Sequence, residues 1–219
     1  MDYTEKTCRD FVESVGSSKP IPGGGSVAAL VGALGASLST MVASLTIGKK
    51  KYIGVEFEMQ KNIDEIYKIQ NELLDLVQQD IDNFEPLAQL YKKKASTPEE
   101  KAALKEAKQN ALYEACLVPM EIIQKCGRAI ELAQEFATKG NKVVIADSGS
   151  SAVLCKAAMQ AASFNIYINT NMMKDKELAK KINGECTARI VYYGALADAV
   201  FGYTTNTLIN TVIETGHTI

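Results

Sequence analysis

The stretch Pro22-Gly23-Gly24-Gly25-Ser26 leads directly into a run of small and aliphatic residues, Val27-Ala28-Ala29-Leu30-Val31-Gly32-Ala33-Leu34-Gly35-Ala36. Three consecutive glycines permit positive φ angles and leave backbone N–H groups uncovered. If a helix begins at Ser26, its unpaired amides and its dipole add to a surface that suits an anionic or carbonyl-bearing ligand. For a triglycine taken alone, a flexible turn before a core helix is the favoured interpretation.

The helix that follows decides the fold. No charged residue occurs between Pro20 and Gly48, and three lysines follow. The segment is long enough to cross a bilayer, which needs about 20 apolar residues. However, its serines, threonines, alanines and glycines dilute the hydrophobicity, and the mean hydropathy of the whole chain is −0.05. A buried helix that packs through small faces explains this better than a membrane span, so we expect a central helix from about residue 26 to 47.

Outward from this segment, almost all of the sequence has helical periodicity. Five further helices are expected: one that Thr4 caps, one from about Gly54 to Tyr91 with a bend at Pro86, one from Pro98 to Thr138 with a disturbance at Pro119, one from Asp147 to Met172, and one from Asp175 to Gly216. The clearest start is Thr97-Pro98-Glu99-Glu100, which combines a capping threonine, a proline at the first position and a capping-box glutamate. No alternating strand pattern appears. We therefore predict an all-α fold, a single domain over residues 1–219 in which about six long helices surround the small-residue helix.

Composition narrows the classes of function. The chain has 24 Lys plus Arg against 26 Asp plus Glu, and its net charge of −2 gives no support to nucleic-acid binding. Its cysteines are widely spaced and its N-terminus, charged from Asp2, lacks an apolar signal segment, which favours a cytoplasmic protein with reduced thiols. The single histidine, His217, argues against a histidine triad or a multi-histidine metal site. Acid–base chemistry then falls to carboxylates, lysine, tyrosine or cysteine.

An ordered series of motifs resembles the cyclodeaminase/cyclohydrolase family over residues 4 to 213. The series comprises Ser17, Pro20, Pro22-Gly23-Gly24-Gly25-Ser26, Leu45-Thr46-x-Gly48-Lys49-Lys50-x-Tyr52, Asp80-x-x-x-Phe84, Val118-Pro119, Gly140-Asn141, Ala146-Asp147, Asn165-x-x-x-Asn169 and Asp175. The resemblance implies an all-helical homodimer that acts on one-carbon units of tetrahydrofolate without a redox cofactor or a metal. Two reactions occur in the family. Water opens 5,10-methenyltetrahydrofolate to 10-formyltetrahydrofolate, or 5-formiminotetrahydrofolate closes to the methenyl compound and expels ammonia.

Two carboxylates are candidates for the proton transfer that both reactions need. Asp147 and Asp80 match family positions, and a carboxylate near the pterin can deprotonate water or protonate departing ammonia. From the residues alone, a cap for its own helix is the favoured interpretation of Asp147, and the family match is what makes it a catalytic candidate. Asp80 lies beside Asp82 on a helix, where a solvated face is the alternative, and its apolar neighbours leave its direction open.

Further candidates would bind the substrate through amides and hydroxyls. Gly23–Gly25 offer backbone N–H groups, and Ser26 can bond the ligand, cap its own helix or do both. Asn165 and Asn169 lie one helical turn apart and share a face. From that face they can pair with the donor–acceptor edge of a pterin or bridge two helices.

Lysines are the candidates for the anionic tail of folate. Lys49 and Lys50 are typical of a helix C-terminus and can also hold the glutamate carboxylates. A second triplet, Lys92–Lys94, is expected to be a solvated linker. An unbroken helix over residues 26–47 would place the glycine loop about 30 Å from Lys49, and the helix after Asp147 separates it from Asn169 in the same way. An antiparallel homodimer with a site at or near the subunit interface would bring these residues together.

These observations predict a folate enzyme that acts at the N5–C–N10 bridge, with no cofactor beyond tetrahydrofolate and with no membrane or nucleic-acid partner. By analogy with stand-alone relatives, the cyclohydrolase reaction is favoured over the cyclodeaminase reaction. A non-catalytic helical scaffold and a single-span membrane protein are the alternatives from other classes.

Overall fold

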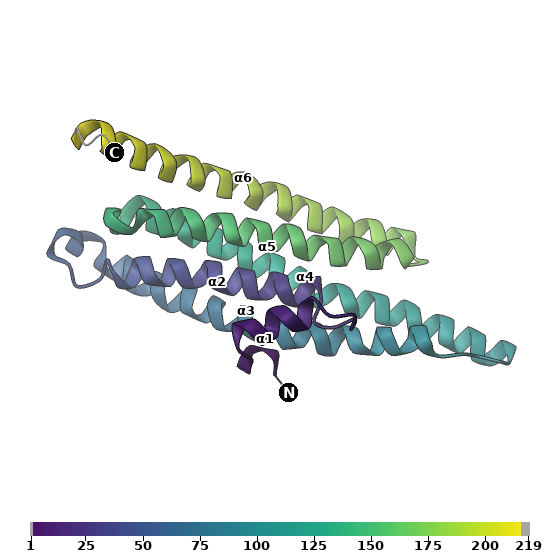
Figure 1. Ribbon diagram of the computed structural model, residues 1–219. Coiled ribbons are helices and arrows are strands. Elements are labelled where there is room, and N and C mark those ends of the chain that lie inside the picture. Colours follow the sequence, from purple (N-terminus) through teal and green to yellow (C-terminus); the bar gives the residue numbers. More distant parts are fainter. Residues whose placement is uncertain (1, 216–219) are drawn as a thin grey trace.

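The computed structural model describes residues 2–215, so His217 and the expected helix end at Gly216 lie outside the described residues. The long elements are α1 (Cys8–Val15), α2 (Gly24–Ser44), α3 (Glu56–Lys92), α4 (Pro98–Lys139), α5 (Ile145–Met172) and α6 (Lys176–Thr215). Short 3-10 helices cover Tyr3–Glu5, Lys50–Val55 and Lys142–Val144. No strand occurs in the described range, and the predicted all-α bundle of six helices is confirmed (Figure 1).

The bundle is built around α2, as its composition predicts. Helices α3, α4 and α5 all pack against α2, and α6 packs against α4 and α5. In Figure 1, α6 is the outermost long helix on one side, and the α3–α4 hairpin extends beyond the other helices. The apolar side chains that meet between these helices form one cluster that draws on all six, which fixes the position of α2 from three sides.

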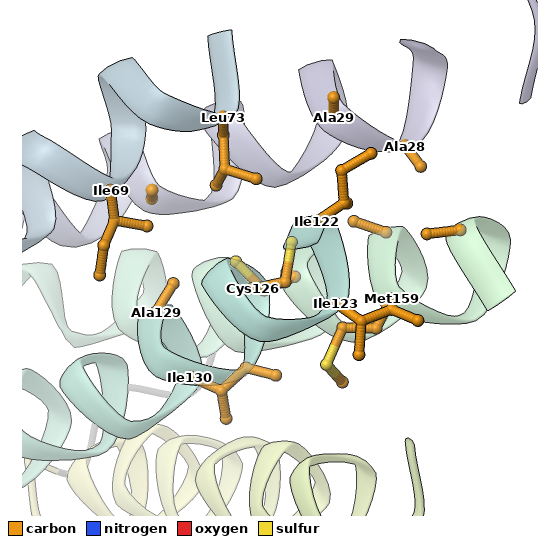
Figure 2. Close-up of a cluster of buried hydrophobic side chains, with 14 of the residues drawn as sticks. Ala28, Ala29, Ile69, Leu73, Ile122, Ile123, Cys126, Ala129, Ile130 and Met159 are labelled. Carbon is orange, nitrogen blue, oxygen red and sulfur yellow. The ribbon is translucent and has the colours of Figure 1, made fainter. Parts of the chain in front are cut away.

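Small residues on α2 permit this close packing. A Cβ at Gly32 would lie 2.6 Å from the Cys126 sulfur on α4, and a Cβ at Gly35 would lie 2.7 Å from the Cys155 sulfur on α5. Figure 2 shows Ala28 and Ala29 of α2 in the same buried cluster as Leu73 and Cys126. Because a core this dense cannot admit another methyl group without displacement, overpacking at either glycine would cost about 1–3 kcal/mol.

Among the described residues, α2 is the helix that is long and apolar enough to span a membrane by length and composition, and 56% of its most apolar window is buried inside the bundle. The face of α2 turned away from α4 retains exposed apolar side chains. Leu34 is 55% exposed, Met41 43% and Leu45 38%. One side of α2 is therefore buried against α3, α4 and α5, and its other side is uncharged and exposed.

Two expected helix starts are wrong. Asp2, rather than Thr4, caps the first turn, because its carboxylate accepts from the Thr4 N–H, and α1 begins later under a cap from Thr7. Asp147 does not cap α5, which begins two residues earlier at Ile145. There Asn141 caps a 3-10 turn that runs directly into the helix, and Asp147 becomes an acidic residue of the first turn.

The glycine loop also differs from expectation. None of Gly23–Gly25 has a positive φ, and Gly48 is the positive-φ residue in the described range, with φ of 75°. Helix α2 begins at Gly24 with Gly23 as its N-cap, so Ser26 lies inside the first turn and does not cap. The triglycine thus serves close approach to a neighbouring side chain rather than a left-handed turn.

The interior prolines leave the long helices continuous. α3 passes through Pro86 and α4 passes through Pro119 without a break in helical hydrogen bonding that would end the element. The predicted capping box at the start of α4 is confirmed, with Thr97 accepting from the Glu100 N–H and Glu100 accepting from the Thr97 N–H.

Candidate active site

A pocket of about 160 Å³ opens where the first turn of α2 meets the last third of α5. The two helices run antiparallel: Gly24 lies beside Asn165, while the Ser39 hydroxyl donates to Ser151 at 2.8 Å, near the start of α5. α3 and α4 supply the remaining walls. The lining residues are Pro20, Ile21, Gly23, Gly24, Gly25, Asp80, Asn83, Phe84, Ala115, Pro119, Asn165, Ile168 and Asn169.

Asp80 is the only acidic side chain in this lining. Its Oδ2 accepts a hydrogen bond of 2.9 Å from the Ser26 hydroxyl, and the Ser26 backbone N–H donates to the same carboxylate. A Cβ at position 25 would overlap the carboxylate itself, so Gly25 is the residue that lets Asp80 lie against the start of α2. The direction that the sequence left open is thereby settled: Asp80 points into the pocket.

Burial raises the pKa of Asp80 above that of an ordinary aspartate, and the two hydrogen bonds from Ser26 act in the opposite direction. Because desolvation is the larger effect, the carboxyl group titrates closer to neutral pH than an exposed one. A carboxyl group with such a pKa can accept a proton and return it within one reaction cycle, which is the property of a general acid–base catalyst.

Asn165 and Asn169 both line the pocket, as their shared face predicts. The Asn165 amide nitrogen donates to Ala161 O of its own helix at 3.2 Å. The Asn169 amide nitrogen donates to Ala115 O on α4 at 3.2 Å. Pro119 lacks the N–H that would normally bond that carbonyl, so Asn169 satisfies the acceptor that the proline leaves free. Asn169 therefore bridges helices through its nitrogen, and its side-chain oxygen remains an acceptor beside the pocket.

A cysteine adjoins the same wall. Burial raises the pKa of Cys116 to about 11, although the Asn169 amide partly offsets this effect. The thiol therefore stays protonated at neutral pH, and a protonated thiol is a poor nucleophile. Asp80 is left as the residue of the pocket best suited to move a proton.

Sequence reasoning missed several residues of the pocket. Asn83 donates to Glu114 O at 2.6 Å and lies one turn after Asp80, while Ile168 lies between the two asparagines and is 61% exposed. Helical spacing from Asp80 and Asn165 would have found both of them. Pro20, which belongs to the motif series, and Ile21 line the pocket from the loop before α2, where no periodicity exists to guide the prediction.

The other predicted residues lie elsewhere. Ser26 is fully buried and bonds Asp80 rather than lining the pocket. Lys49 and Lys50 follow the opposite end of α2, whose 21 residues span about 31 Å. Asp147 lies in the first turn of α5, at that same distant end. Within one chain, these lysines and Asp147 do not join the pocket.

The distant end is occupied by a hydrogen-bonded cluster of Thr46, Tyr52, Asn141 and Lys142, here called the clasp. The Asn141 N–H donates to the Thr46 hydroxyl at 2.9 Å, and the Asn141 amide donates to Leu45 O at 2.9 Å. The Lys142 N–H donates to the Tyr52 hydroxyl at 3.2 Å, and its ammonium donates to Thr138 O at the end of α4. The clasp joins the α2–α3 connection to the α4–α5 connection.

Comparison with known proteins agrees with the motifs and the fold. Residues 7–188 match the family model described as formiminotransferase-cyclodeaminase, and the chain belongs to this enzyme family. Methenyltetrahydrofolate cyclohydrolase from Methylorubrum extorquens is 34% identical over 196 residues, which cover 90% of this chain and 94% of that protein. Formimidoyltransferase-cyclodeaminase from Mus musculus is 32% identical over 177 residues, but these are only 33% of its length.

A solved structure extends the agreement to three dimensions. Formiminotetrahydrofolate cyclodeaminase from Thermotoga maritima superposes with a TM-score of 0.78 at 29% sequence identity, covering 95% of this chain and 98% of that one. The family resemblance stated from the motifs is therefore confirmed.

Proposed function

We propose that this protein is a methenyltetrahydrofolate cyclohydrolase, which opens the 5,10-methenyl bridge with water to give 10-formyltetrahydrofolate. The cyclohydrolase from Methylorubrum extorquens supports this choice because the two chains align over nearly their whole lengths. The observation that carries the proposal is the partly buried Asp80 carboxyl group, held at the start of α2 and lining the pocket.

In the proposed mechanism, Asp80 accepts a proton from water as the water oxygen attacks the methenyl carbon. A tetrahedral carbon forms between N5 and N10. The proton then passes from Asp80 to N5 as the C–N5 bond breaks, and the hydroxyl group releases its own proton to solvent as it becomes the C=O of the formyl group on N10. Gly24 and Gly25 of the first turn of α2 line the pocket, and N–H groups at a helix start, which lack partners within the helix, would stabilise negative charge on the attacking oxygen.

The remaining residues have binding roles in this proposal. The side-chain oxygens of Asn165 and Asn169 would accept hydrogen bonds from the pterin, and Ser26 positions Asp80. The bridging carbon keeps its oxidation state throughout, so the reaction needs no cofactor beyond the tetrahydrofolate substrate. The chain would act as one helical unit in the cytoplasm, where its cysteines, all free in the structure, stay reduced.

Ring closure with release of ammonia is the second candidate, and the structural match to the Thermotoga maritima cyclodeaminase favours it. There N10 attacks the formimino carbon and gives up its proton to Asp80, and Asp80 passes that proton to the departing nitrogen, which leaves as ammonia as its bond to the carbon breaks. The tetrahedral carbon lies between the same two nitrogens in both reactions, so one pocket suits both.

The predicted homodimer belongs to this proposal. Besides the exposed side of α2, the outer side of α5 presents Phe164 at 69% exposure, Ile168 at 61% and Val153 at 44%. An antiparallel pairing through these faces places the distant end of one subunit beside the pocket of the other. Lys49 and Lys50 of the partner subunit would then approach the anionic tail, and Asp147 of the partner subunit would lie close to the same pocket.

The test of activity follows methenyltetrahydrofolate absorbance with purified protein. Faster loss of the methenyl compound supports the cyclohydrolase, and formation of the methenyl compound from 5-formiminotetrahydrofolate supports the cyclodeaminase. If neither rate exceeds the uncatalysed rate, the enzyme proposal is refuted. An unchanged rate in Asp80→Asn would instead remove Asp80 from the mechanism.

Subunit mixing tests the shared site. Asp80→Asn and Lys49→Ala/Lys50→Ala variants are prepared separately and then exchanged. Each mixed dimer would contain one pocket with an intact Asp80 and intact lysines of the partner subunit. A purified mixed dimer should therefore reach about half of the wild-type activity, and an equimolar exchanged mixture about a quarter. Activity that stays at the mean of the two parent variants would mean that each pocket is complete within one chain.

A further inference from the structure

Two prolines lie inside the long helices α3 and α4, and one of them is at the pocket. Pro86 of α3 is exposed, whereas Pro119 of α4 is buried and lines the pocket. A proline has no N–H, so the carbonyl four residues earlier loses its helical partner. For Pro119 that carbonyl is the one of Ala115, which also belongs to the pocket lining. The proline therefore leaves a backbone acceptor free at the candidate active site.

Asn169 of α5 is the residue that bonds this free acceptor. Its amide nitrogen donates to Ala115 O at 3.2 Å, and because Asn169 is only 5% exposed, water has little access to replace that partner. A donated N–H also accounts for the direction in which Asn169 changes the pKa of Cys116, which is downward. Turning the amide over would set its oxygen against Ala115 O, and the loss of a buried hydrogen bond disfavours that orientation by at least about fivefold. The amide is thus held with its nitrogen toward α4.

The other two asparagines of the pocket are oriented in the same way. The Asn83 nitrogen donates to Glu114 O at 2.6 Å, and the Asn165 nitrogen donates to Ala161 O at 3.2 Å. No donor among the described residues bonds the side-chain oxygen of any of the three asparagines. With the carboxylate of Asp80, these oxygens make the polar side-chain lining of the pocket rich in acceptors. A ligand that faces them must therefore supply hydrogen-bond donors.

A reduced pterin ring meets this requirement, because its ring N–H groups and its exocyclic amino group are donors. An asparagine that is free to turn can present either its oxygen or its nitrogen, and it then binds a donor or an acceptor of the ligand equally well. A fixed acceptor discriminates against a ligand that lacks the donor, because the acceptor is then left unpaired. The fixed orientation of Asn169 therefore affects which ligand binds.

We infer that Pro119 is a positioning residue for the substrate, an inference that rests on the proposed function. Because Pro119 leaves Ala115 O without a helical N–H, it holds Asn169 as a hydrogen-bond acceptor for the pterin ring. Pro119 acts through Asn169 and takes no part in the chemical step. Its replacement should therefore weaken substrate binding more than it lowers turnover.

A double-mutant cycle on Pro119→Ala and Asn169→Ala tests this coupling. The new alanine N–H can bond Ala115 O within α4, so it competes with the Asn169 amide. In Pro119→Ala, the KM for methenyltetrahydrofolate should rise about five- to tenfold, while kcat changes by less than about twofold. In the Asn169→Ala background, the same substitution should change KM by less than about twofold. A KM that rises equally in both backgrounds would mean that Pro119 acts by its own contact with the ligand, and would overturn the inference.

The melting temperatures of the same variants give a readout besides activity. Asn169→Ala leaves Ala115 O unpaired in a buried place and should melt below wild type. Pro119→Ala returns an N–H to that carbonyl, so it should raise the melting temperature more in the Asn169→Ala background than in wild type. Pro86→Ala is the matched control, because it replaces an exposed proline inside α3. The control should shift the melting temperature equally in both backgrounds and keep the wild-type KM. Equal shifts from Pro119→Ala would overturn the inference.

If Asn169→Ala does not fold, hydrogen exchange of the Asn169 side-chain amide, followed by NMR, decides the question. Exchange that is at least about fivefold faster in Pro119→Ala than in wild type supports the inference, and equal rates overturn it. An active wild type without coupling between the two positions overturns the inference and leaves the proposed function intact. A wild type that turns over neither methenyltetrahydrofolate nor 5-formiminotetrahydrofolate refutes the proposed function itself, and the role of Pro119 toward this substrate with it.

Discussion

Motif residues of the family occur at both ends of α2, but they form a hydrogen-bonded cluster at one end and a pocket at the other. At the C-terminal end, Thr46 and Asn141 bond each other, and Tyr52 and Lys142 complete the clasp. At the N-terminal end, Asp80 receives two bonds from Ser26, yet burial still raises its pKa and its carboxylate reaches a pocket. The polar atoms of the clasp residues are hydrogen-bonded to one another, so these residues stabilise the fold. Residues left beside open space are available for a substrate.

Of the substitutions that test this difference between the two ends, Asp80→Asn should have the largest effect on activity. Removal of a general acid–base group should lower kcat by about 10²- to 10⁴-fold. Because burial raises the pKa of Asp80, the native state retains this proton to higher pH than the unfolded chain, and the ionised carboxylate destabilises the fold at neutral pH. The variant should therefore melt at a higher temperature at pH 7, a gain that disappears below the ordinary aspartate pKa.

Calorimetry and steady-state kinetics on one preparation check both effects. Asp75→Asn is the matched control, since it removes an exposed carboxylate from the same helix, α3. Wild-type activity in Asp80→Asn, or a lower melting temperature at pH 7, would contradict the role given to its buried carboxyl group.

Gly25→Ala should have the next largest effect. The new Cβ would overlap the Asp80 carboxylate and displace it from the start of α2. A displacement of about 1 Å in a catalytic group can cost about 10²-fold in rate, and overpacking costs about 1–3 kcal/mol of stability. Gly24→Ala is the control, because its Cβ would meet Asn165 at 3.5 Å, an ordinary contact. Equal losses in the two variants would deny the special role of position 25.

Ser26→Ala tests how the start of α2 sets the pKa of Asp80, and the pH–rate profile measures the effect. The Ser26 hydroxyl lowers the pKa of Asp80, so its removal should raise that pKa further, while the backbone N–H bond remains. The acid limb of the pH–rate profile should then move to higher pH, with only a few-fold loss at the plateau. Loss of a hydrogen bond to an ionised group should also cost about 1.5–3 kcal/mol at neutral pH. A shift of the acid limb to lower pH would contradict the assignment.

The smallest effect on catalysis is expected at the clasp. Asn141→Ala removes the amide that donates to Leu45 O and leaves buried groups unpaired, which should cost about 1–3 kcal/mol of stability. The kcat of the folded variant should equal that of wild type. Urea unfolding measures the first quantity and kinetics at low temperature the second. A kcat that falls as far as in Ser26→Ala would show that the clasp serves the chemistry.

The sequence predicted the fold well because its strongest signals are local. Thr97-Pro98 and the uncharged run after Pro22 specify helices without reference to the rest of the chain. The helix boundaries that were predicted wrongly lie where two nearby residues can each cap the same turn. Asp2 displaced Thr4 as a cap, and Asn141 started a turn that moved the beginning of α5 ahead of Asp147.

The site was only partly predictable. Spacing alone placed Asn165 and Asn169 on one face, and the structure brings both to the pocket. The direction of Asp80 depends on how closely α3 approaches α2, a tertiary distance that no local pattern encodes. The bridge from Asn169 to the carbonyl that Pro119 frees joins two helices far apart in sequence, and only the folded chain shows it.

The overlap between position 25 and the Asp80 carboxylate also has a historical consequence. A descendant of this protein that keeps the acid acquires a side chain at position 25 only at a cost to rate and stability, whereas one that has lost the acid does not meet this overlap. Loss of the acid therefore relaxes the constraint on position 25. Among descendants, an alanine at position 25 is therefore expected mainly in proteins that have also lost the acid at position 80.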